Sequence, residues 1–296
     1  MRVYVLAVVL LSVAVAWAQA PPDHAGTFIL STVDTRGEAI TDIAPQDLEV
    51  EVGPHTIAVR GLTRYHDAPI RVIVVLDESS SMAARWRVAL AIVLDLLQSL
   101  PRNATVGLVG INGETPEVIN GRSAITRYLT NRARQGPGGW TRLWDNVHAA
   151  LGALPQPRPT DVIFVISDGD DTASKLSFRD LEHEVRAARV RVSGALLLEN
   201  PTAAAPTSAD LGELIDETGG WDLTAMPFLH TAPEDGRIEV ASAVPNYAAF
   251  FRTMFDFYLV EVGGEFRPDA PLRVRMSPGR QAVLVSAPQH LAPAQP

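Results

Sequence analysis

Five residues with oxygen donors in their side chains stand out at potential ligand positions: Asp77, Ser79, Ser81, Thr141 and Asp168. Two of them are carboxylates and three are hydroxyls. Oxygen donors without sulfur or imidazole suit a hard divalent cation, with Mg²⁺ first and Mn²⁺ or Ca²⁺ as alternatives. Two carboxylates only just balance a 2+ charge, so the ion stays electrophilic, and an incoming carboxylate can displace a bound water. The five residues therefore predict a metal site that holds an acidic side chain of a protein partner.

The elements around these residues place them at one edge of a sheet. The nearly all-apolar strand Ile70–Leu76 runs directly into Asp77, and the apolar strand Asp161–Ser167 runs into Asp168. Thr141 precedes a helix that begins near Leu143. In an open parallel sheet, ligands bind at the carboxyl ends of the strands. We therefore expect the five side chains to converge there although they are far apart in the chain.

Each of these residues alone has a simpler interpretation. Ser79, Ser81 and Thr141 are common helix N-caps, and Asp168-Gly169 is a common turn. The metal site is favoured because every segment lies after an expected strand or before an expected helix. Trp140 and Trp144 lie beside Thr141; they could pack in the core or form an apolar rim around the metal.

The chain divides into three zones by pattern, and its 296 residues suggest about two domains. Short β-rich runs come first, then strands that alternate with helices, and finally β again. The β–α alternation predicts a doubly wound, mostly parallel α/β sheet. The expected strands are Thr27–Val33, Leu48–Val52, Thr56–Leu62, Ile70–Leu76, Thr105–Ile111, Asp161–Ser167, Val190–Leu198, Phe257–Val262, Leu272–Met276 and Gln281–Ser286, and the expected helices are Ala84–Leu100, Ala124–Arg132, Leu143–Leu154, Phe178–Ala188, Ala209–Thr218 and Asn246–Phe255.

The two β zones flank the α/β zone in the sequence. A β segment of about 40 residues is too small to be stable alone, so it needs a partner. We therefore expect residues 26–66 and 257–288 to pair into a small β-sandwich, with the α/β domain of residues 70–256 inserted between them.

The motifs resemble those of the von Willebrand factor type A domain. Its three metal-binding segments correspond to Asp77-x-Ser79-x-Ser81, to Gly139-x-Thr141-x-Leu143-x-Asp145, and to Ser167-Asp168-Gly169. The resemblance runs from about Ile70 to Tyr258. It implies a metal-ion-dependent adhesion site, with the three hydroxyls on the metal and Asp77 and Asp168 binding directly or through water.

The flanks resemble those of the acidobacterial-type von Willebrand factor A-related proteins. Before the α/β zone stand Val33-Asp34-x-Arg36-Gly37 and Ile43-x-x-x-Asp47-Leu48-x-Val50, and after it stands the aromatic strand that begins Phe257-Tyr258. Leu48 replaces the usual aromatic residue, and the chain after Tyr258 is only loosely similar.

The N-terminus predicts export. Arg2 precedes an apolar stretch from Val3 to Ala16, and Ala16-Trp17-Ala18 has the small–x–small pattern of a signal-peptide cleavage site. This stretch is shorter than the ~20 residues of a membrane span. We expect residues 1–18 to be removed and the rest to be periplasmic or secreted, without a transmembrane span; an uncleaved anchor is the alternative.

Composition excludes several functions. The absence of cysteine excludes disulfides, Cys-ligated zinc and a thiol nucleophile. A net charge of −9 disfavours nucleic acid as a partner. The seven histidines show no metal-ligand spacing.

We expect a binding protein and no enzyme. A haloacid-dehalogenase-type phosphatase would share the strand that ends in Asp77 and the acidic pair Asp170-Asp171, but Ser79 stands where its general acid belongs. A serine hydrolase using His148 lacks a Gly-x-Ser-x-Gly elbow. A structural envelope module with a vestigial metal site is the remaining alternative.

Overall fold

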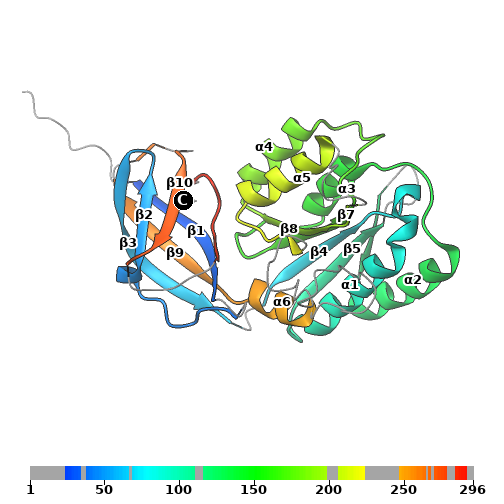
Figure 1. Cartoon of the computed structure of the whole chain (residues 1–296), viewed down its shortest axis with the longest axis horizontal. Coiled ribbons are helices and arrows are strands. Elements are labelled where there is room, and N and C mark those ends of the chain that lie inside the picture. Colours follow the sequence, from blue (N-terminus) through cyan, green and yellow to red (C-terminus); the bar gives the residue numbers. More distant parts are fainter. Residues whose placement is uncertain are drawn as a thin grey trace, which may run out of the picture.

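The computed structural model describes residues 24–34, 38–66, 69–110, 116–198, 206–223, 247–264, 266–267, 270–278 and 284–291. They form two domains that lie side by side (Figure 1). One is an α/β domain and the other a β domain. The predicted signal segment 1–18 lies outside the described residues. Within the described part of the chain, no helix has both the length and the apolar character to cross a membrane.

The α/β domain is built on a five-stranded sheet in the order β6-β5-β4-β7-β8. β4, β5, β7 and β8 are parallel, and the edge strand β6 pairs with β5 antiparallel. The predicted doubly wound, mostly parallel sheet is therefore confirmed. The strands are β4 (Arg71–Leu76), β5 (Thr105–Gly110), β6 (Glu117–Asn120), β7 (Val162–Ser167) and β8 (Arg191–Leu196).

Helices cover both faces of this sheet (Figure 1). On β4, Val72 and Val74 point into one core with α1, α2 and α6, while Ile73 and Val75 point into the other with α3, α4 and α5. β4, which is apolar at every position after Arg71, is thus buried on both faces. The helices are α1 (Trp86–Ser99), α2 (Arg122–Gln135), α3 (Leu143–Gly152), α4 (Phe178–Ala188), α5 (Pro206–Glu217) and α6 (Tyr247–Met254).

The β domain joins strands from both ends of the chain. Its six-stranded sheet has the order β10-β2-β3-β9-β1-β11, and every pairing is antiparallel. The C-terminal strand β9 lies between the N-terminal strands β3 and β1, so neither end of the chain can build this sheet alone. The strands are β1 (His24–Val33), β2 (Leu48–Val52), β3 (His55–Tyr65), β9 (Phe257–Gly264), β10 (Leu272–Met276) and β11 (Leu284–Ser286).

The two edges of the β-domain sheet meet. Beyond β11, the Leu291 N–H donates to the Ala270 carbonyl, and the Leu272 N–H donates to the Gln289 carbonyl. The curled sheet encloses a core that includes Leu30, Val50 and Val260. The expected small sandwich is therefore a single sheet folded on itself.

The observed elements depart from the expected ones at a few ends. The predicted helix at Ala84 is preceded by a 3₁₀ turn, Ser80–Ala84, and α1 itself begins at Trp86. A second 3₁₀ turn, Pro45–Asp47, precedes β2. β6 was missed because four residues, two of them exposed and two half-buried, give too short a pattern. Residues 281–283 of the last predicted strand lie outside the described residues.

The two domains share buried contacts. Ile29 and Val33 of β1 belong to the same core as α1 and α6 of the α/β domain. The Ser286 hydroxyl donates to the Gly220 carbonyl. Gly219 has a φ of +69° at the end of α5, and a Cβ there would lie 2.5 Å from the Pro288 nitrogen, so glycine is required for this close approach.

We predict that Phe251→Ala lowers the free energy of unfolding by about 3–5 kcal/mol. Phe251 is fully buried in α6 and packs edge-on against Phe164 of β7, with ring centroids 5.4 Å apart. Urea denaturation measures the change. Leu94→Ala, at an exposed position of α1, is the control and should cost far less. An equal cost for both variants would contradict the placement of α6.

Candidate metal site

The candidate site lies where β4 and β7 end. The two strands are parallel neighbours with Leu76 opposite Ile166, so Asp77 and Asp168 emerge at the same edge of the sheet. The Asp77 N–H donates to the Ile166 carbonyl, which extends the pairing by one residue. The sheet topology thus brings the two predicted carboxylates together although they lie 168 − 77 = 91 positions apart in the sequence.

The Asp77 carboxylate is buried and held from both strands. Its Oδ1 accepts the Ser79 N–H at 2.9 Å, and its Oδ2 accepts the Ser167 hydroxyl at 2.6 Å. Burial raises the pKa of Asp77 to about 6; these hydrogen bonds oppose the shift, and the charge of Asp168 adds to it. Among the described residues no cationic side chain contacts Asp77. A positive charge at this place would stabilise the buried carboxylate.

Ser79 and Ser81 direct their hydroxyls to one another, with the two Oγ atoms 2.9 Å apart. Ser79 is the N-cap residue of the 3₁₀ turn, yet its side chain makes no capping hydrogen bond. The simple interpretation of Ser79 as a helix cap is therefore wrong for its side chain. Both hydroxyl oxygens keep lone pairs for a cation.

Thr141 is buried, and backbone hydrogen bonds join its loop to the loops that carry Asp77 and Asp168. The Gly138 N–H donates to the Glu78 carbonyl and the Ser80 N–H to the Gly139 carbonyl. On the other side, the Thr141 carbonyl accepts the N–H groups of Thr172 and Ala173. The backbone thus carries Thr141 to the same edge of the sheet as Asp77 and Asp168.

Thr141 does not cap α3 either. The N-cap position is Arg142. The first N–H groups of α3 instead donate to side chains from the β7 loop: Leu143 N–H to Asp171 Oδ1 at 2.7 Å, and Trp144 N–H to the Ser174 hydroxyl at 3.1 Å. Asp171, one of the two acids of the phosphatase alternative, therefore has a structural role at the start of α3.

Asp168 combines a turn with an available carboxylate oxygen. Its Oδ1 accepts the Asp170 N–H at 3.3 Å, as in an ordinary Asx turn. Its Oδ2 lies 3.9 Å from Nη1 of Arg85, which also donates to the Ser81 carbonyl. Arg85 was not predicted; it supplies a positive charge at the border of the site.

The donor set decides which metal chemistry fits. Among the described residues no group of three or more His, Cys, Asp or Glu side chains is placed to hold a metal ion. The candidate site has only two such residues, and its remaining donors are hydroxyls. All-oxygen donors with two carboxylates fit a hard divalent cation, which Asp77, Ser79, Ser81, Thr141 and Asp168 would hold.

A buried ion pair attaches the loop that follows β4 to α2. Glu78 is fully buried; its Oε1 accepts the Tyr128 hydroxyl at 2.8 Å, and its Oε2 lies 3.1 Å from Nη2 of Arg132. Tyr128 and Arg132 both belong to α2. No local pattern of the sequence indicates this cluster, because Glu78 and α2 are distant in the chain.

The two tryptophans have different environments. Trp144 is buried and contacts Phe178 with ring centroids 5.3 Å apart, so it is a core residue. Trp140 is 77% exposed, directly before Thr141. His148 is exposed on α3 and its Nδ1 lies 2.6 Å from Oε2 of Glu184, so it is a surface residue.

Residues 72–170, which lie within the α/β domain, match the family described as von Willebrand factor type A domain. The matched segment contains all five predicted ligands. No curated protein sequence matched the chain.

Several solved structures are similar to part of this chain. One is an aerotolerance-related membrane protein from Bacteroides fragilis NCTC 9343, with 16% identity over 52% of this chain and 90% of that chain, at a TM-score of 0.41. Another is BatB from Bacteroides thetaiotaomicron, with 18% identity, 52% and 89% coverage and a TM-score of 0.37. A third is the manganese-loaded TRAP protein of Plasmodium vivax, with 14% identity, 77% and 96% coverage and a TM-score of 0.39. Likenesses this distant support no functional argument.

We predict that Arg132→Met destabilises the protein by about 3–5 kcal/mol, because it leaves the buried Glu78 carboxylate without its cation. The double variant Glu78→Gln, Arg132→Met should recover part of this loss. Urea denaturation of the two single variants, Glu78→Gln and Arg132→Met, and of the double variant gives the coupling energy. Additive effects of the two substitutions would contradict the ion pair.

Proposed function

We propose that the protein is a binding module that holds a divalent cation and, through it, an acidic group of a partner protein. The observation that carries the proposal is the convergence of three loops with oxygen donors at the carboxyl ends of β4 and β7. The ligands are Asp77, Ser79, Ser81, Thr141 and Asp168, and Mg²⁺ is the first candidate, with Mn²⁺ or Ca²⁺ as alternatives.

The charges at the site support a cation. Asp77 and Asp168 repel one another, and burial makes the charged form of Asp77 unfavourable. A divalent ion would offset both effects. Its chemistry is that of a Lewis acid with an exchangeable position, to which a carboxylate from outside can bind. Because three of the five donors are neutral hydroxyls, the negative charge of the ligands would not exceed the 2+ charge of the ion.

The surroundings favour a protein partner. Trp140 offers an exposed aromatic surface directly beside Thr141, and exposed aromatic residues are enriched at protein interfaces. The net charge of −9 repels an acidic partner, so the cation would supply the attraction that the chain lacks. The partner we propose therefore presents an Asp or Glu side chain within an apolar surround.

Export belongs to the same proposal. Residues 1–18 have the pattern of a cleaved signal peptide, and the chain has no cysteine that oxidation could damage outside the cytoplasm. We propose a periplasmic or secreted location for the mature protein. A binding role rather than catalysis follows from a site that offers ligands but no general acid, since Ser79 occupies the position where a phosphatase would need one.

We predict that Mg²⁺ or Mn²⁺ binds the protein with one site, and that Ser79→Ala weakens this binding by about tenfold or more. Asp77→Asn should abolish the binding without lowering the stability of the metal-free protein, because burial penalises the charged carboxylate. Titration calorimetry measures the affinity, and urea denaturation in chelator measures the stability. Ser99→Ala, at the far end of α1, is the matched control. No binding by the unchanged protein, or equal binding by Asp77→Asn, contradicts the metal site.

We predict that a chelator releases the partner. Proteins captured from envelope extract in Mg²⁺ should be lost in EDTA and in the double variant Asp77→Ala, Asp168→Ala, and they should be reduced by Trp140→Ala. A capture that chelation leaves unchanged would favour a structural module with a vestigial site. Turnover of phosphate esters by the metal-loaded protein would favour the phosphatase instead.

A further inference from the structure

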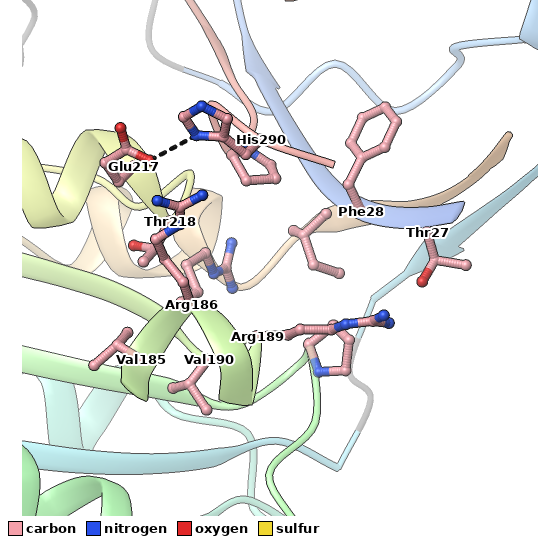
Figure 2. A pocket seen from close by; sticks show the side chains of 13 residues that line it. Thr27, Phe28, Val185, Arg186, Arg189, Val190, Glu217, Thr218 and His290 are labelled. Carbon is pink, nitrogen blue, oxygen red and sulfur yellow. Dashed lines mark hydrogen bonds and ion pairs between the residues drawn. The ribbon is translucent and has the colours of Figure 1, made fainter. Parts of the chain in front are cut away.

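A cavity of about 70 Å³ lies between the two domains, away from the candidate metal site. Its walls come from β1 of the β domain and from α4, β8 and the end of α5 in the α/β domain (Figure 2). Arg191 is the first residue of β8, whereas the metal site lies beyond the last residues of the parallel strands. The cavity is therefore at the opposite edge of the sheet.

The cavity wall carries an excess of positive charge. Three arginines line it, together with a single acid, Glu217, whose Oε2 lies 3.0 Å from Nδ1 of His290 (Figure 2). Arg186 has a partner in Glu182 at 3.6 Å. Among the described residues, Arg189 and Arg191 have no carboxylate partner.

Arg191 is the more unusual of the two, because it is only 1% exposed. Its guanidinium lies over the ring of Phe257, with Cζ 4.7 Å from the centroid, and its Nη1 is 3.3 Å from the Ser31 hydroxyl. Its Nε and Nη2 have no hydrogen-bond partner among the described residues. A buried guanidinium with unmet donors is costly unless something pairs with it.

The two unmet nitrogens of Arg191 form one edge of the guanidinium. That edge is the fork that binds a carboxylate or phosphate through two parallel hydrogen bonds. Elsewhere in this chain the same edge is filled: Nε and Nη2 of Arg64 bind Asp256, and those of Arg71 bind Asp161. The same edge of Arg191 has no such partner among the described residues.

Arg189 adds a second cation from another element. It ends α4 in the left-handed conformation, with a φ of +57°, which is unfavourable for a residue other than glycine. Figure 2 shows its side chain extending toward β1, where Thr27 lies. Burial lowers the pKa of Arg189 and lowers that of Arg191 to about 10, with no acidic neighbour acting against it.

We propose that this interdomain cavity binds a small oxyanion, a phosphate or carboxylate group, through the Nε and Nη2 edge of Arg191 and the guanidinium of Arg189. The volume suits such a group, since a single water needs about 10–15 Å³ of the same space. Because the wall comes from both domains, the bound anion would also hold them together.

Titration calorimetry with inorganic phosphate and, separately, with acetate tests this site, in EDTA and at constant ionic strength so that the metal site takes no part. We expect at least one of the two anions to bind, and Arg189→Gln to weaken that binding about tenfold or more. The control Arg179→Gln removes the same charge from the exposed face of α4 and should leave the affinity unchanged. Binding of neither anion, or equal affinities for the unchanged protein and Arg189→Gln, overturns the proposal.

Thermal unfolding of an Arg191 variant distinguishes a loss of anion binding from a defect in folding. Without added anion, Arg191→Met should be as stable as the unchanged protein or more stable, because an unpaired buried charge is removed. The anion that binds should raise the melting temperature of the unchanged protein by about 5–10 °C at 100 times its dissociation constant, and should not raise that of Arg191→Met. An equal rise in both proteins would overturn the role of Arg191.

Discussion

The carboxylate of Asp77 is clamped between two neighbouring strands, and the arrangement of the candidate site depends on this clamp. The N–H of Ser79 holds one oxygen from the loop after β4, and the hydroxyl of Ser167 holds the other from the end of β7. Both strands are buried on both faces, so the clamp cannot move without disturbing two cores. A rigid, buried and uncompensated carboxylate is a poor choice for stability alone but a good one for a cation ligand.

Hydrogen bonds and ion pairs made by side chains also hold the loops that carry the other proposed ligands. Glu78 fixes the first loop to α2, and Asp171 and Ser174 join the β7 loop to α3. The protein buries a second unmet charge, the guanidinium of Arg191, at the opposite edge of the sheet. Asp77 lies within the α/β domain, whereas the cavity lined by Arg191 is closed by both domains. Among the described residues, the candidate metal site therefore carries an unpaired negative charge and the interdomain cavity an unpaired positive charge, and different elements build the two sites.

Much of the fold follows from the sequence because strands that are apolar except for one end residue, such as β4 and β7, have few alternatives to a buried parallel sheet. The convergence of Asp77 and Asp168 follows from the same reasoning, since parallel neighbours end at one edge. β6 was not predicted because its four residues, two exposed and two half-buried, are too few to show a hydrophobic periodicity. The pairs Glu78–Arg132 and Arg85–Asp168, and the unmatched edge of Arg191, depend on side-chain directions across distant elements, which no local pattern encodes.

The central claim is that the three loops hold a divalent cation, and anomalous diffraction from crystals grown with Mn²⁺ tests it most directly. We predict one strong anomalous peak within about 2.0–2.4 Å of the hydroxyl oxygens of Ser79 and Ser81, and the loss of that peak in Asp77→Asn crystals. No peak at this edge of the sheet, or a peak that persists in Asp77→Asn, would contradict the account.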